Sequence, residues 1–234
     1  MIKKNESGIY PDSYYKNSYN GRYNNYVEVP SKLDFPKSFL NVFFALPANA
    51  KVLDYGCGRG GFLKSLQYWR PDLDYYGVDV SDVGKFLPDF VEYKNILKEK
   101  CEFLGVEFDL VICSHVLEHV QYPLDIVGEI FALLKKDRYC YALAPANRSI
   151  FAIAMNFWGD YGHIRAFSKF GFRRLFVDAG FFVEKVKIIR SLKSFLVLPY
   201  LIIKPLVTFN FRAWSTIWDD VILGWTVMIL AKKE

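Results

Sequence analysis

The sequence has few of the signals that mark export, zinc binding or nucleic-acid binding. Its first ten residues, MIKKNESGIY, contain no apolar segment of the kind that a secretory signal needs, so we expect a cytoplasmic protein. None of the four cysteines forms a CxxC pair, which predicts reduced thiols and no zinc site. The net charge of +5 is too small to indicate a nucleic-acid partner.

An apolar run long enough to span a membrane is also lacking. The most apolar segment, an insert at residues 191–218, is broken by Pro199, Lys204 and Pro205 well short of the ~18 residues that a spanning helix needs. The wider segment 185–218 carries six basic residues and no acidic one. Two interpretations of the insert stay open: a helical roof over a ligand pocket, which we favour, or an interfacial segment in peripheral contact with anionic lipid.

Length and composition predict one compact domain behind an N-terminal arm. A chain of 234 residues with 52% hydrophobic content can bury a sizeable core. The first 30 residues are instead rich in Tyr, Asn and Ser, so we assign residues 1–35 to an arm and residues 36–234 to the domain. The arm is either disordered or a lid that closes through its tyrosines, which are Tyr14, Tyr15, Tyr19, Tyr23 and Tyr26.

Strand and helix patterns alternate along the domain. A first helix is predicted near residues 36–46, and further helices near 60–69, 96–104 and 123–135. Strands are predicted near residues 51–55, 75–79, 91–94, 108–113 and 138–144, with a final strand near the C-terminus. Alternation at this spacing indicates an α/β fold with a mostly parallel sheet covered on both faces, whose ligands bind beyond the carboxyl ends of the strands.

The most informative motif is KVLDYGCGRGGFL at residues 51–63. An apolar strand ends in Asp54 and is followed by a glycine cluster that opens a helix, which is typical of a turn that holds a nucleotide. A second strand ends in Asp79, about 20 residues beyond the glycines, where a carboxylate can accept hydrogen bonds from ribose hydroxyls. The glycines also satisfy the GxGxxG spacing of dinucleotide-binding domains, which alone is a weak signal.

Taken together, the motifs resemble those of class I S-adenosylmethionine-dependent methyltransferases, in the branch that acts on small molecules. DYGCGRG at residues 54–60 is similar to the DxGxGxG motif of that family, and FDLVICSHVLEHV at residues 108–120 looks like its fourth motif. GHIRAFSKFGFRRLFVDAGFFVEKV at residues 162–186 resembles a later segment of the family. The resemblance implies a doubly wound, mostly parallel seven-stranded sheet with an antiparallel last strand, and S-adenosyl-L-methionine as cofactor.

The resemblance also implies which residues contact the cofactor. Asn95 stands where the family usually has an aspartate that reads the adenine amino group, and it can still accept one hydrogen bond. The predicted cofactor-binding residues are Asp54, Tyr55, Gly56, Gly58, Gly60, Asp79, Val80, Asn95, Ile96, Ser114 and His115.

Two histidines are the candidates for catalysis. His119 follows Glu118 in the fourth motif, where related quinone-pathway O-methyltransferases place residues beside the substrate, and His163 lies in the later segment. A role in tying loops to backbone carbonyls is the alternative for His163. Some of those O-methyltransferases bind a divalent metal ion with the help of a further acidic residue. That residue corresponds to Ser114 here, so no metal site is expected. We interpret Ser168 as the cap of the following helix.

The function that the resemblance implies is methyl transfer from S-adenosylmethionine to a small or lipid-like acceptor, with an oxygen nucleophile favoured. Transfer would be an in-line displacement, in which alignment and exclusion of water supply most of the catalysis. A dinucleotide-dependent oxidoreductase and a non-catalytic binding protein on the same fold are the alternatives. The sequence gives no indication of the oligomeric state.

Overall fold

The computed structural model describes residues 32, 35–96, 105–147, 157, 158, 160, 162–189 and 226–234. Several predictions fall outside these residues: the arm with its tyrosines, the insert at residues 191–218, Cys101, and all but the first residue of the helix expected at 96–104.

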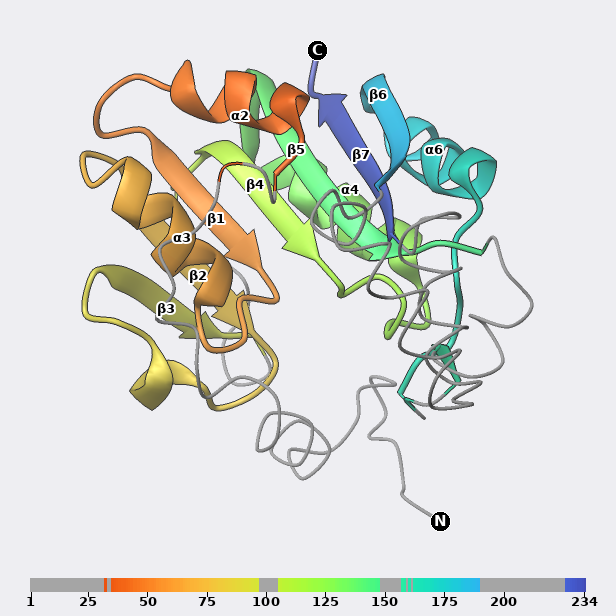
Figure 1. The fold of residues 1–234 in the computed structure, drawn as a ribbon, viewed down its shortest axis with the longest axis horizontal. Helices are drawn as coiled ribbons and strands as arrows, with labels where there is room; N and C mark the ends of the chain where they lie inside the picture. The colour runs from red at the N-terminus through yellow and green to blue at the C-terminus, as the bar shows by residue number, and fades with distance from the viewer. Residues whose placement is uncertain are drawn as a thin grey trace, which may run out of the picture.

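A seven-stranded sheet with the strand order β3-β2-β1-β4-β5-β7-β6 forms the centre of the described fold (Figure 1). Every neighbouring pair is parallel except the two pairs that include β7, which is antiparallel to β5 and to β6. The predicted fold class is therefore confirmed. The strands are β1 (Lys51–Tyr55), β2 (Asp74–Asp79), β3 (Val91–Asn95), β4 (Phe108–Ser114), β5 (Leu134–Pro145), β6 (Phe182–Ile189) and β7 (Thr226–Lys232).

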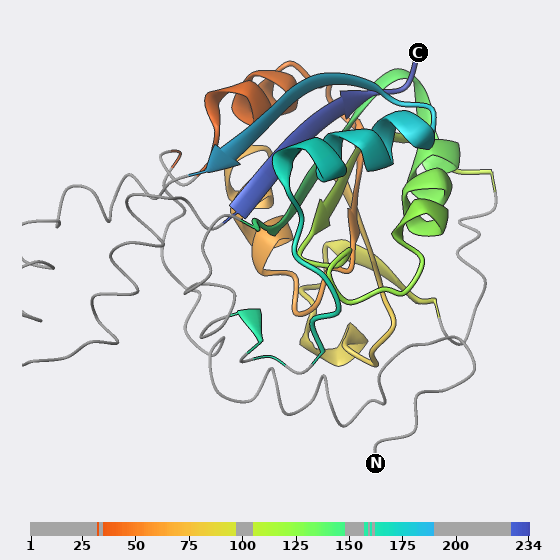
Figure 2. The ribbon, with the colours of Figure 1, turned by 90° about the vertical axis from the view of Figure 1, so that its right-hand side faces the viewer.

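Helices cover both faces of the sheet, as Figure 2 shows in the turned view. The helices α2 (Lys37–Phe44) and α3 (Gly61–Trp69) pack on one face, and α4 (Pro123–Leu133) and α6 (Lys169–Asp178) on the other. A short 3₁₀ helix, η2 (Gly84–Phe86), follows β2. Ser168 caps α6 as predicted, since its Oγ accepts a hydrogen bond of 2.9 Å from the backbone N–H of Gly171.

The boundary between α4 and β5 differs from the prediction. The helix was expected to reach residue 135, but it ends at Leu133 and the strand begins at Leu134. Leu134 pairs with Phe108 of β4, and the Lys135 ammonium lies 2.7 Å from the carboxylate of the buried Asp109. These sheet contacts outweigh the helical pattern of the preceding residues.

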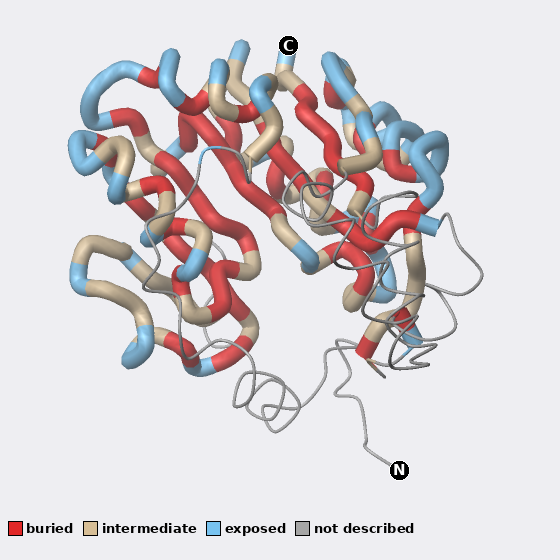
Figure 3. The backbone as a smooth tube through the Cα atoms, in the orientation of Figure 1, coloured by how far each residue is buried: buried red, intermediate tan, exposed pale blue. Residues whose placement is uncertain are grey.

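The core consists of two layers, one on each face of the sheet, and Figure 3 shows how the central strands are buried. Successive residues of a strand point to opposite faces. In β4, for example, Val111 and Cys113 belong to the layer under α4 and α6, whereas Leu110 and Ile112 belong to the layer under α2 and α3. Among the described residues, no helix is long and apolar enough to cross a membrane.

Candidate functional site

The glycine turn lies between β1 and α3, at the edge where the parallel strands β1, β2 and β4 end (Figure 1). Gly56, Gly58 and Gly60 have φ angles of 85°, 51° and 72°, a left-handed region in which other residues are strained. The backbone N–H groups of Gly56 and Cys57 both donate to the carbonyl of Val78, at 2.8 and 2.9 Å. The turn is thereby fixed to the end of β2.

Asp79 is the second anchor of this turn. Its Oδ2 accepts a hydrogen bond of 2.8 Å from the backbone N–H of Gly58, and its Oδ1 accepts one of 2.8 Å from that of Ser81. Burial raises the pKa of Asp79, and the hydrogen bonds from Ser81 and Gly58 act in the opposite direction. Each carboxylate oxygen has a second lone pair, so Asp79 can also accept hydrogen bonds from a ligand.

Asp54 is the buried acid of the site. It is 2% exposed, and within the described part of the chain its Oδ1 has no hydrogen-bond partner. Burial, with a further contribution from the charge of Asp79, raises its pKa to about 7. An unpartnered buried carboxylate oxygen is costly, and a cationic ligand would offset that cost. The methionine end of S-adenosylmethionine is cationic, so the residues present fit this cofactor.

The other predicted cofactor residues gather at the same edge. Asn95 is the last residue of β3 and pairs in register with Asp79, and the N–H of Ile96 donates to the Asp79 carbonyl at 3.0 Å. Val80 directly follows β2, and Ser114 is the last residue of β4. Their contact with cofactor stays a prediction.

Tyr55 is placed differently from the others. Its side chain is 2% exposed and belongs to the core layer under α4, where its hydroxyl donates a hydrogen bond of 2.8 Å to Oε2 of Glu129. Tyr55 thus stabilises the packing of α4 on the sheet, and only its backbone is at the ligand edge.

His115 begins the loop after β4 with a left-handed backbone, at φ 57°. Its N–H donates to the Leu143 carbonyl of β5 at 3.0 Å, and its ring Nδ1 lies 3.0 Å from Oε1 of Glu118. Since a carboxylate only accepts, Nδ1 is the donor. The other carboxylate oxygen of Glu118, Oε2, is buried, and no residue that the structure describes forms a hydrogen bond with it.

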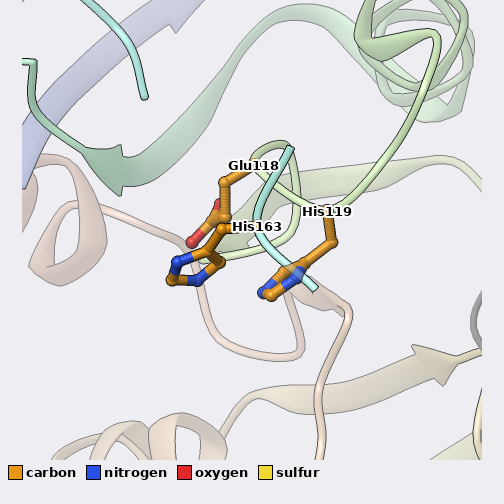
Figure 4. A group of neighbouring side chains, drawn as sticks. All are labelled: Glu118, His119 and His163. Atoms are coloured by element: carbon orange, nitrogen blue, oxygen red, sulfur yellow. The ribbon is translucent and has the colours of Figure 1, made fainter. Parts of the chain in front are cut away.

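The two predicted catalytic histidines are brought together, although they lie far apart in the sequence. The segment that follows β5 docks on the β4 loop through the N–H of Ile164, which donates to the Glu118 carbonyl at 2.8 Å. The ring centroids of His119 and His163 are consequently 4.7 Å apart. Figure 4 shows both rings and the Glu118 carboxylate gathered in one group.

Backbone carbonyls fix the tautomer of both histidines. Nδ1 of His119 lies 3.2 Å from the Gly162 carbonyl, and Nδ1 of His163 lies 2.8 Å from the Phe157 carbonyl. Because a carbonyl only accepts, both Nδ1 atoms carry a proton, and Nε2 is the nitrogen that bears the lone pair when the ring is neutral. Burial lowers the pKa of His119, so its ring is neutral at neutral pH.

Glu118 is a site residue that the sequence did not predict to be catalytic or cofactor-binding. It is fully buried, whereas glutamate is rarely so unless it is paired. Its position between two predicted site residues, in LEHV, was the available signal. Its carbonyl accepts the N–H of Ile164 from the later segment, a contact that the sequence pattern does not describe.

Comparison with known proteins agrees with this geometry. Residues 29–186 match a family model described as "Methyltransferase domain". Over 113 residues the chain is 33% identical to the ubiquinone biosynthesis O-methyltransferase of Psychrobacter cryohalolentis, a match that covers 44% of this chain and 43% of the relative. The chain thus aligns with less than half the length of this curated relative.

Two solved structures share the fold. One is an S-adenosylmethionine-dependent methyltransferase from Archaeoglobus fulgidus, with a TM-score of 0.58, 21% identity and coverage of 84% of this chain and 90% of the other. The second is phosphoethanolamine N-methyltransferase 2 of Haemonchus contortus in complex with phosphomonomethylethanolamine and S-adenosylhomocysteine. Its TM-score is 0.59 at 17% identity, and the match covers 84% of this chain and 51% of the other.

Proposed function

Because this chain belongs to the S-adenosylmethionine-dependent methyltransferases, whose domain model matches residues 29–186, we propose that it methylates an oxygen of a small acceptor. The observation that supports an oxygen acceptor is the position of His119 in the loop after β4, where the Gly162 carbonyl holds its Nδ1 and burial lowers the pKa of its ring. A hydroxyl must lose its proton when it is methylated, and a neutral histidine is suited to take it. The O-methyltransferase relative supports the same choice of atom.

The glycine turn and the two buried acids would hold the cofactor. Asp79 would accept hydrogen bonds from the ribose, and Asp54 would face the cationic methionine end. Bound there, S-adenosylmethionine supplies a methyl group already activated by its positive sulfur. The protein therefore has to align the acceptor with that methyl group and exclude water.

His119 would act as the base through Nε2. The Gly162 carbonyl holds the proton on Nδ1, so the lone pair of Nε2 is the one available for the acceptor hydroxyl. His163, whose ring contacts His119, would orient it and line the acceptor site. The described residues do not identify the acceptor beyond this class of chemistry.

The direct test is a screen of acceptors for release of S-adenosylhomocysteine by the purified protein. Hydroxyl acceptors, such as phenols and catechols, are expected to react, and amines are not. With a reactive hydroxyl acceptor, His119→Gln is expected to lower kcat by about 10²- to 10⁴-fold while the affinity for S-adenosylhomocysteine stays unchanged. The exposed variant Asp89→Asn serves as the control and should keep full activity.

Two outcomes would contradict the proposal. If amines react and hydroxyl compounds do not, the atom that is methylated is nitrogen and not oxygen. An unchanged kcat in His119→Gln would show that this ring takes no proton.

A further inference from the structure

Glu118, His119 and His163 form a group whose chemistry goes beyond that of a base and its neighbours. One ligand-type atom from each residue lies within 4.8 Å of the other two (Figure 4). Glu118 is fully buried, and its Oε2 has no hydrogen-bond partner among the described residues. A buried carboxylate oxygen of this kind is stabilised by a partner, which the described part of the chain does not supply.

The remaining polar atoms of the three side chains are already held by the protein. His115 donates to Oε1 of Glu118, the Gly162 carbonyl accepts from Nδ1 of His119, and the Phe157 carbonyl accepts from Nδ1 of His163. Metal-binding histidines commonly donate their other ring N–H to a carbonyl, which fixes the tautomer and orients the ring. Here that outer shell is complete for all three side chains.

We propose that Glu118, His119 and His163 bind a divalent transition-metal ion through one carboxylate oxygen and two Nε2 atoms. Two imidazoles with one carboxylate suit Zn²⁺ or Co²⁺, whereas Mg²⁺ and Ca²⁺ prefer oxygen ligands. Ligands of a tetrahedral zinc ion lie roughly 3.4 Å apart when the metal–ligand bonds are about 2.1 Å. Each side chain already places one ligand-type atom within 4.8 Å of the other two, so a small closing movement would reach this spacing.

The prediction of no metal site considered only the segment that contains Ser114 and Glu118. His163 comes from a later segment and is the ligand that the sequence pattern could not supply. The earlier prediction stays untested by any bound ion, and the arrangement of these side chains argues against it.

Three protein ligands leave a coordination position open for water or an oxygen of the acceptor. A bound ion and the proton of an acceptor compete for Nε2 of His119. A bound ion would supply Lewis acidity, lowering the pKa of a coordinated hydroxyl, and His119 would then serve as a ligand rather than as the base. Metal binding does not require methyl transfer, so a failure of this inference leaves the proposed function standing.

The test is a titration of untagged, chelator-treated full-length protein with Co²⁺ and with Zn²⁺, followed by absorption spectroscopy and calorimetry. One equivalent is expected to bind. The Co²⁺ spectrum should show ligand-field bands of low coordination number without a thiolate charge-transfer band, which would exclude the four cysteines as ligands.

Variants of the three histidines distinguish the residues that bind the ion from the residue that only orients a ligand. His119→Gln and His163→Gln are each expected to weaken binding at least 100-fold. His115→Gln changes only an outer-shell group, so it should keep one equivalent and lose about tenfold in affinity. Circular dichroism and thermal melts check that each variant folds. Glu118 is fully buried, so a Glu118→Gln variant is at risk of failing to fold. His163 is only half-buried, and His163→Gln is therefore the safer variant for the test.

The inference is wrong if the folded wild-type protein binds neither ion, or if folded His163→Gln binds Co²⁺ as tightly and with the same spectrum as the wild type. In that second case the ion is held elsewhere on the chain.

Discussion

The backbone N–H of Gly58 donates a hydrogen bond of 2.8 Å to Oδ2 of Asp79, 21 residues later in the chain. This contact joins the turn after β1 to the carboxyl end of β2, so one carboxylate both shapes the turn and faces the ligand edge. Its removal should therefore affect the shape of the turn and cofactor binding together.

The first prediction concerns Asp79→Ala. This variant loses the acceptor for the Gly58 and Ser81 amides and the predicted ribose contact. Two or three lost hydrogen bonds to a charged group are expected to weaken S-adenosylhomocysteine binding by about 10²-fold or more, measured by calorimetry. The exposed variant Asp89→Asn should bind like the wild type. Full affinity in a folded Asp79→Ala protein would remove Asp79 from the cofactor site.

The second prediction is a pH dependence of cofactor binding that comes from Asp54. Because its pKa is raised to about 7, the carboxyl of the ligand-free protein is protonated below that pH. A cationic ligand favours the ionised form, so affinity should fall by up to about tenfold per pH unit below 7 and level off above it. In Asp54→Asn this dependence should disappear. Comparison of the two proteins cancels the titration of the ligand itself.

Asp54 also affects the stability of the ligand-free protein. The pKa rises from 3.8 to about 7 on folding, so between these pH values the folded state binds the proton more tightly than the unfolded state. The contribution of Asp54 to the free energy of unfolding is then present at low pH and lost as the pH rises through 7. Chemical denaturation at pH 5 and pH 8 should show this loss in the wild type and a smaller one in Asp54→Asn.

The third prediction compares two glycines of the same turn. A Cβ at Gly56, where φ is 85°, would lie 2.2 Å from Cγ2 of Val116, whereas a Cβ at Gly61 would meet nothing within 4 Å. Gly56→Ala should therefore lower the melting temperature strongly, and Gly61→Ala should leave it unchanged or raise it slightly. Val116→Ala is expected to rescue Gly56→Ala only in part, because it removes the clash but not the strained φ. Equal melting temperatures for the two glycine variants would contradict this account.

The fourth prediction concerns the cap of α6. Ser168→Ala removes the oxygen that accepts from the Gly171 amide, and it should lower the free energy of unfolding by about 1 kcal/mol. The matched variant Ser65→Ala, inside α3, should have little effect, since its hydroxyl donates only to the Gly61 carbonyl one turn earlier. Urea denaturation of both proteins measures the difference.

The strands β1, β2 and β4 could be predicted from the sequence because each is a short, largely apolar run with a polar residue at or next to its carboxyl end. Asp54 is the penultimate residue of β1 and Asp79 the last of β2, and the structure places both at one edge of the sheet. The boundary at Leu134 could not be predicted, because its cause is pairing with Phe108 on another strand.

Contacts between distant segments account for what the sequence left open at the site. The proximity of His119 and His163 depends on the backbone hydrogen bond from Ile164 to Glu118. A backbone hydrogen bond requires no particular side chain, so it cannot be predicted from the amino-acid sequence. The side chain of Tyr55 faces Glu129 rather than the ligand edge because alternation along β1 points it into the core. The local sequence pattern predicts at which edge of the sheet a residue lies, but it does not predict which other residues its side chain contacts there.

The position of β7 between β5 and β6 has a consequence for synthesis of the chain. Within the described sheet, β6 pairs with no strand other than β7, which emerges from the ribosome after it. While residues 190–225 are being translated, Phe182–Ile189 has no sheet neighbour and exposes an unpaired edge. We therefore expect β6 to join the sheet only after Thr226–Lys232 has been made, and a nascent chain that stalls before Thr226 to be a substrate for chaperones.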